Sequence, residues 1–199
     1  MYVLEGFVIG LGTIIFIGPV FFLLLNISLQ KGVKAGLIVA LGIISSDIVC
    51  VLLCYFGVSQ LFVTAAYQFW LGIVGSIILF GLGISYVLKK PVFVNTRQIK
   101  SKALYSFFIK GFSVNFFNPF VFIVWVGIYK YGQLKYTNEV SMLWFLVTVL
   151  LGILVTDILK VFLSEKLRKF ITSKRLKIFF RITGVILILC SIRVLYIVL

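Results

Sequence analysis

Six long apolar runs divide this chain, and their length limits what it can fold into. They cover approximately residues 3–29, 35–59, 67–88, 104–129, 141–163 and 178–199. About 20 apolar residues in an α-helix cross the hydrocarbon of a bilayer. Only 12% of the residues are charged, whereas a soluble domain carries about 25%. We therefore expect an all-α polytopic membrane protein with six transmembrane helices in a single transmembrane domain, residues 1–199.

The basic residues indicate how these runs are oriented. Of the 19 Lys and Arg residues, 16 lie in the stretches 31–34, 89–110 and 160–181, between the apolar runs or near their ends. Nucleic-acid binders instead place basic residues among polar ones on an exposed face, so the net charge of +14 does not predict nucleic-acid binding. Because cytoplasmic loops are rich in Lys and Arg, we expect an inner (cytoplasmic) membrane protein with both termini outside. No basic residue precedes the first run and no cleavage site follows it, so we expect a retained span.

Three short motifs of the first half recur, in the same order, in the second half. They pair 16–22 with 116–122, 42–49 with 152–159, and 75–79 with 184–188. In the second pair, GIISSDIV and GILVTDIL, Asp47 matches Asp157. In the first pair, FIGPVFF and FFNPFVF, Pro19 matches Pro119. The chain is therefore predicted to contain an internal repeat.

The repeat predicts an inverted architecture. Each half holds three spans, an odd number, so the second half must insert upside down relative to the first. We expect repeat 1 at about 3–88, a basic cytoplasmic linker at about 89–103 and repeat 2 at about 104–199. Inverted repeats are typical of secondary transporters, which place their sites near the bilayer midplane.

Gly18-Pro19 and Asn118-Pro119 interrupt the first and fourth runs. Proline lacks the N–H that a helix interior needs and clashes with the preceding turn, so both helices are predicted to break there. A helix that restarts within the membrane presents free N–H groups and a positive dipole end, which suit a carboxylate. The alternative is a simple kink.

Asp47 and Asp157 are the candidate coupling residues. A carboxylate in the middle of a span is costly unless it is paired, protonated or hydrated, and it usually marks a functional site. Hydrogen bonds from Ser45 and Ser46 would give Asp47 a structural role instead. Asp157 lies three residues before Lys160, close enough for an ion pair on one helix, so a structural salt bridge and a transport role remain open.

Other polar residues in the runs carry weaker predictions. Arg193 either extends to the outer interface or binds a substrate carboxylate, and Asn115 is expected to satisfy carbonyls freed by the break at Pro119. Cysteines in apolar runs usually act as small apolar residues. The chain has no His, no phosphate-binding loop and no recognisable catalytic set, so we predict no metal site, no cofactor and no enzymatic activity.

Several motifs resemble the LysE/RhtB family of amino-acid exporters along the whole chain. In the first half these are Gly18-Pro19, Ser28-Leu29-Gln30-Lys31-Gly32, Ala35-Gly36, Gly42 and Ser46-Asp47, and in the second half Gly111-Phe112 and Asn118-Pro119. The chain departs from the family at Ile17, where the family has proline, and at Ser46, where it has glycine.

The resemblance implies export of amino acids or related small zwitterions from the cytoplasm, driven by the proton gradient, and a homodimer. Together with the residues above, it suggests that the α-carboxylate lies at Gly18, Pro19, Asn118 and Pro119, while Asp47 holds the ammonium group or the coupling proton. Two alternatives stay open: an inorganic-ion exporter of the same superfamily, and a membrane thiol–disulfide carrier, which would need cysteines beside the helix breaks.

Labelling of introduced cysteines tests the predicted topology. On a cysteine-free background, Thr64→Cys and Ser101→Cys are expected to react from opposite faces of the membrane, because the charge asymmetry places one connection outside and the other inside. A membrane-impermeant maleimide on intact and on opened cells makes the measurement. Reaction of both residues from the same face would contradict the topology and the inverted repeat.

Overall fold

The computed structural model describes residues 1–15, 18–56, 65–88, 101–168 and 172–198, and helices are the only regular secondary structure in this part of the chain. Its elements are α1 (Tyr2–Gly12), the 3-10 helix η1 (Thr13–Ile15), α2 (Pro19–Lys31), α3 (Val33–Tyr55), α5 (Ala65–Leu88), α6 (Ser101–Phe116), α7 (Pro119–Lys135), α8 (Glu139–Arg168) and α9 (Ser173–Val198). The predicted all-α class is confirmed. Most of the predicted linker, residues 89–100, lies outside the described residues.

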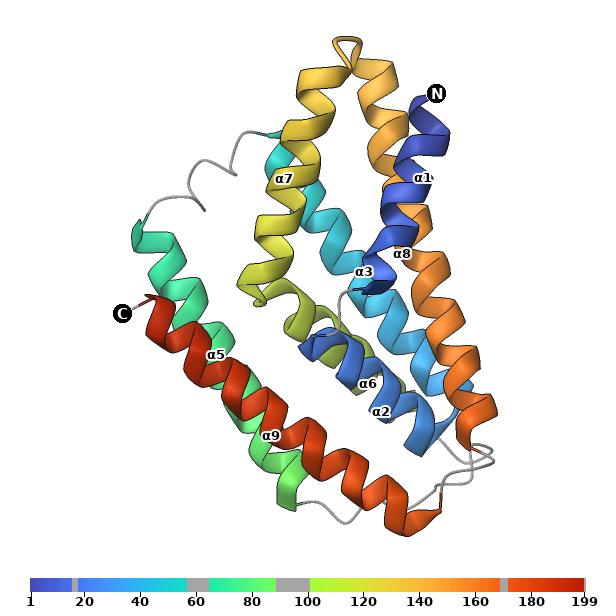
Figure 1. Cartoon of the computed structure of the whole chain (residues 1–199), viewed down its shortest axis with the longest axis vertical. Helices are drawn as coiled ribbons and strands as arrows, with labels where there is room; N and C mark the ends of the chain where they lie inside the picture. The colour runs from blue at the N-terminus through green and yellow to red at the C-terminus, as the bar shows by residue number, and fades with distance from the viewer. Residues whose placement is uncertain (16–17, 57–64, 89–100, 169–171, 199) are drawn as a thin grey trace.

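New helices begin at both predicted prolines. Pro19 and Pro119 each occupy the first turn of a helix, where a missing N–H costs nothing because that group has no intrahelical partner. The axis turns by 77° between the α1–η1 segment and α2, and by 66° between α6 and α7. The first and fourth runs are therefore broken, and α2 and α7 both begin near mid-height of the molecule (Figure 1).

Within the described residues, two helices are long and apolar enough to cross a membrane singly, α3 and α8. The pairs α1–α2 and α6–α7 qualify if each bent pair forms one span, which brings the number to four. These lengths support a polytopic membrane protein. The six-span inverted repeat stays a prediction, because α5 and α9 do not qualify by this measure.

Helices from the two halves pack against one another in three pairs: α1 against α8, α3 against α6, and α5 against α9. The helices α3 and α8 also contact each other. In Figure 1 the α5–α9 pair lies to one side of the other helices. The two sets are linked by contacts of α2 with α9 and of α5 with α7.

Each of the three pairs crosses at glycines. A Cβ added to Gly42 would collide with the backbone of α6, and one added to Gly152 would collide with the backbone of α1. Gly83 and Gly184 each face the other's backbone between α5 and α9. Small residues let helix backbones approach closely in membranes, where dispersion and polar contacts replace the hydrophobic effect. The three crossings are therefore set by residues without side chains.

A polar cluster joins the start of α1 to the end of α7. The carboxylate of Glu5 accepts hydrogen bonds from Tyr131 and from Tyr136, the latter at 2.6 Å, and pairs with Lys135 at 2.5 Å. The start of α1 and the end of α7 lie at the same end of the molecule as the turn between α7 and α8 (Figure 1). The cluster holds together segments that are more than 120 residues apart in sequence.

Substitution at a crossing glycine tests the packing. Gly42→Ala is expected to lower the free energy of unfolding by about 1–3 kcal/mol, the usual cost of overpacking, because its methyl group meets the backbone of α6. Gly81→Ala in α5 is the matched control, since nothing lies within 4 Å of its added Cβ. The control should be neutral or slightly stabilising, because Ala favours helix more than Gly does. Equal melting temperatures of the two variants in detergent would contradict the packing.

Candidate functional site

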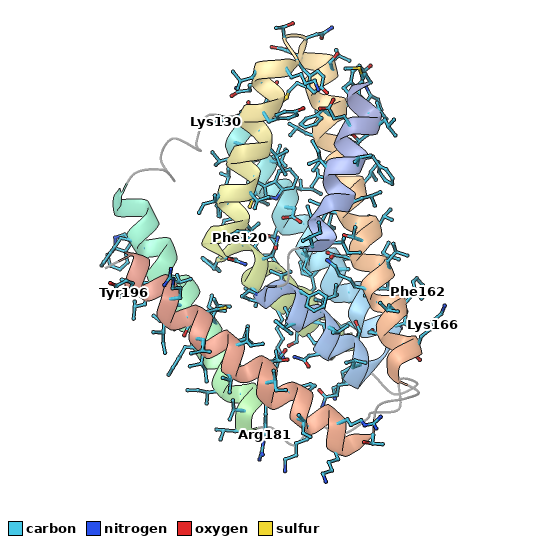
Figure 2. All side chains as sticks on the ribbon, in the orientation of Figure 1. Phe120, Lys130, Phe162, Lys166, Arg181 and Tyr196 are labelled. Atoms are coloured by element: carbon cyan, nitrogen blue, oxygen red, sulfur yellow. The ribbon has the colours of Figure 1, made fainter. Side chains whose placement is uncertain are left out.

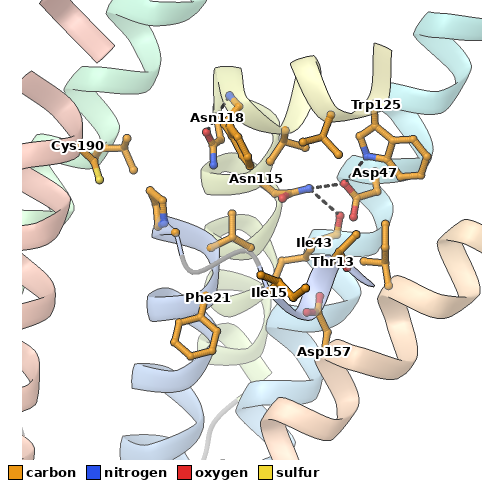
Figure 3. A pocket seen from close by; sticks show the side chains of 18 of the residues that line it. Thr13, Ile15, Phe21, Ile43, Asp47, Asn115, Asn118, Trp125, Asp157 and Cys190 are labelled. Atoms are coloured by element: carbon orange, nitrogen blue, oxygen red, sulfur yellow. Dashed lines mark hydrogen bonds between the residues drawn. The ribbon is translucent and has the colours of Figure 1, made fainter. Parts of the chain in front are cut away.

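A cavity of about 670 Å³ lies where the two helix breaks meet the other helices. Its lining includes Gly18 and Pro19 from the start of α2, Asp47 from α3, and Asn118 from the cap of α7. The helices α8 and α9 add Asp157, Lys160, Cys190 and Arg193. The structure thus brings together four of the five predicted substrate-binding residues and both predicted coupling residues (Figure 3). Pro119 begins α7 beside Asn118.

Asp47 is buried, with 3% of its surface exposed, and its hydrogen bonds come from neutral groups. Its Oδ1 accepts a bond of 2.8 Å from Asn115 Nδ2 on α6 and a bond of 2.8 Å from Trp125 Nε1 on α7. Among the described residues, no ion pair reaches this carboxyl group. The two donors converge on it in Figure 3. Asp47 is therefore held in place by neutral donors rather than by an ion pair.

The serine hydroxyls that would have given Asp47 a structural role do not bond to it. Ser45 donates to the carbonyl of Leu41 at 2.7 Å, and Ser46 accepts from Asn115 at 3.2 Å. Neither hydroxyl is bonded to Asp47. Asn115 was expected to satisfy carbonyls freed by the break, but its amide donates to the Asp47 carboxylate.

The two restarted helices differ in how their first amides are satisfied. The cap of α7 is Asn118, whose side-chain oxygen accepts from the Phe120 N–H at 3.1 Å, as a good N-cap does. The cap of α2 is Gly18, which has no side chain to accept. Since the first N–H groups of any helix lack intrahelical partners, the start of α2 has more capacity for an anionic ligand than the start of α7.

Asp157 and Lys160 form the predicted ion pair. Lys160 Nζ lies 2.9 Å from Asp157 Oδ1, and both side chains are mostly buried. Lys160 also lies over the ring of Phe21, 6.0 Å from its centroid, where an ammonium group is attracted to the π face. Asp157 thus has a structural partner, although the pair lines the cavity.

Two residues of α9, Cys190 and Arg193, line the cavity. The sequence left two roles open for Arg193, extension to the outer interface and binding of a substrate carboxylate, and its exposed side chain now lies in the cavity wall. Cys190 and Arg193 are three residues apart and share one face of the helix. The apolar pattern of the last run gave no sign that this face meets α2. Cys50 and Cys54 are buried and do not line the cavity.

Trp125 is a site residue that sequence reasoning missed. It is 2% exposed and was one aromatic residue among many in the fourth run. Trp125 lies six positions after Pro119. That spacing would have identified it as a site residue only if it had been known that α7 begins at Pro119 and packs against α3. The site therefore holds a buried carboxylate, an ion pair, an arginine and an uncapped helix start around one cavity.

A double-mutant cycle tests the bond between Trp125 and Asp47. Trp125→Phe removes the indole N–H and keeps an aromatic ring, so the free energy of unfolding in detergent should fall. The coupling with Asp47→Ala is expected to be about 1 kcal/mol, the size of hydrogen bonds between membrane helices. Tyr129→Phe in the same helix is a control with no bond to Asp47. Strict additivity of Trp125→Phe and Asp47→Ala would contradict the bond.

Comparison with known proteins gives two matches. The family model "LysE type translocator" matches residues 11–197. The Bacillus subtilis (strain 168) protein named "Putative amino acid efflux protein YcgF" is 30% identical over 132 residues, which cover 63% of this chain and 61% of the relative. The alignment thus spans less than two thirds of either protein. No solved structure matches. Because the family model covers nearly all of the sequence, this chain belongs to the LysE type translocator family, a family of membrane transporters rather than enzymes.

Proposed function

We propose that this protein is a secondary active exporter of amino acids or related small zwitterions across the cytoplasmic membrane, coupled to the entry of protons. The observation that carries the proposal is Asp47, a buried carboxyl group that lines the cavity and is bonded only to neutral donors. Ionisable groups inside transmembrane segments usually belong to substrate pathways or proton relays. The name of the Bacillus subtilis relative, an amino acid efflux protein, is consistent with this substrate class.

The two parts of the cavity suit the two charges of an amino acid. The start of α2, with no side-chain cap at Gly18, receives the α-carboxylate on its free amides. Asp47 receives the ammonium group or, when the substrate has left, the coupling proton. The cap residue Asn118 lines the same cavity and supplies an amide group beside Pro119. Because a zwitterion is neutral overall, its binding adds no net charge to the membrane.

The packing supports the proposed inverted repeat. In the proposed repeat, α1 corresponds to α6, α3 to α8 and α5 to α9. Exchanging each helix for its counterpart converts the α1–α8 pair into the α6–α3 pair. The α3–α8 and α5–α9 pairs map onto themselves under the same exchange. Gly42 and Gly152, which match in sequence, also match in role, because each admits the backbone of the first helix of the opposite half. Rocking of one half against the other would open the cavity to alternate sides.

The orientation follows from charge. We propose that the end carrying Lys166 and Arg181 faces the cytoplasm, opposite the turn between α7 and α8 (Figure 2). Both termini then lie on the outer side. We also propose that the protein functions as a homodimer.

Replacement of the proposed coupling residue is the direct test. Asp47→Asn is nearly isosteric and removes the carboxylate, so it should abolish concentrative export of amino acids from proteoliposomes driven by a pH gradient. If Asp47 only carries the proton, exchange of labelled for unlabelled substrate survives. If it also binds the ammonium group, the affinity for substrate falls as well.

Asp157→Asn serves as the matched control. It removes a carboxylate from the same cavity, but Asp157 is already paired with Lys160, so export should be reduced less than by Asp47→Asn. Wild-type rates of concentrative export from the Asp47→Asn protein would show that this carboxyl group neither carries the proton nor contacts the substrate.

A further inference from the structure

The charged side chains of the cavity leave one acid and one base unpaired. Among the described residues, four line it: Asp47, Asp157, Lys160 and Arg193. Asp157 and Lys160 neutralise each other at 2.9 Å. Neither Asp47 nor Arg193 has an ion-pair partner among the described residues. The cavity therefore offers one negative and one positive group to a ligand, which matches the two charges of a zwitterion with an uncharged side chain.

The rest of the wall is mainly apolar. More than half of the lining residues have aliphatic or aromatic side chains, including Phe21, Ile43, Val121, Val124, Ile153 and Leu189. The polar groups among them are largely engaged. Asn115 donates to Asp47, and the side-chain oxygen of Asn118 caps α7. The Asn118 NH2 group and the free amides at the start of α2 are already assigned to the α-carboxylate. They leave little hydrogen-bonding capacity for a polar substrate side chain, and a buried polar group without a partner is costly.

We propose that the cavity selects amino acids with bulky, apolar, uncharged side chains, such as leucine, methionine and phenylalanine, and that Arg193 balances the α-carboxylate. The inference rests on the proposed function and extends it to a substrate class. A volume of about 670 Å³ lies within the range of ligand pockets and accommodates a large side chain. A third charge, as in lysine or glutamate, would have no counter-ion on this wall.

Specificity is measured first on the unchanged protein. Proteoliposomes loaded with unlabelled L-leucine should accumulate labelled L-leucine by counterflow. L-Phenylalanine and L-methionine should compete with it, whereas L-lysine, L-glutamate and glycine should require at least about tenfold higher concentrations, the loss expected for one uncompensated charge or one missing apolar contact. Competition by lysine or glutamate as strong as by leucine would overturn the substrate class and leave the exporter proposal standing. If no amino acid gives counterflow, both proposals fail.

A ligand that lacks the carboxylate distinguishes a binding role of Arg193 from a role in folding. Protection of Cys190, which lines the same cavity, from a maleimide reports binding without transport. Arg193→Gln should weaken protection by L-leucine at least about tenfold and leave protection by L-leucinamide unchanged or stronger. Arg193→Lys keeps the charge and should retain part of the affinity for leucine. Equal weakening of both ligands by Arg193→Gln, or no weakening of either, would overturn the assignment of Arg193 to the carboxylate.

Discussion

One oxygen of Asp47 holds three helices in register. Its Oδ1 accepts from Asn115 on α6 and from Trp125 on α7, so the carboxyl group on α3 ties together both parts of the broken fourth run. A break inside a membrane is tolerated only where protein or water satisfies the exposed polar groups. The bonds to Asp47 set where α7 leans after the break, and they set the shape of the cavity next to it. The residue that positions two helices is thereby also an acid in the cavity wall.

The close crossings at glycine make this arrangement possible. Gly42 lies one turn before Ser46 on α3 and admits the backbone of α6, which brings Asn115 within 2.8 Å of Asp47. Gly152 gives the same approach between α8 and α1, near Asp157. A larger residue at Gly42 would push α6 away from Asp47, and one at Gly152 would push α1 away from the segment that carries Asp157. Packing and the site chemistry therefore depend on the same short segments of α3 and α8.

Much of this arrangement could be predicted from the sequence. Proline chemistry is local, so the helix starts at Pro19 and Pro119 were predicted from two dipeptides. The pair of Asp157 and Lys160 was predicted because spacing along one helix fixes distance. The partners of Asp47 were not, because Asn115 and Trp125 lie 68 and 78 residues away and nothing in an apolar run indicates which face meets which helix. For the same reason the sequence left two roles open for Arg193: its depth in the last run could be predicted, but the helices beside it could not.

Proton movement during amino-acid efflux tests the central claim most directly. Vesicles containing the protein, an amino acid and a fluorescent pH indicator are diluted into buffer without amino acid and without a pH gradient. Coupled exchange predicts that the interior becomes more acidic as the amino acid leaves, because each departing substrate brings a proton in. Vesicles without protein provide the baseline. Efflux of the amino acid through the protein with no change of internal pH would contradict proton-coupled export.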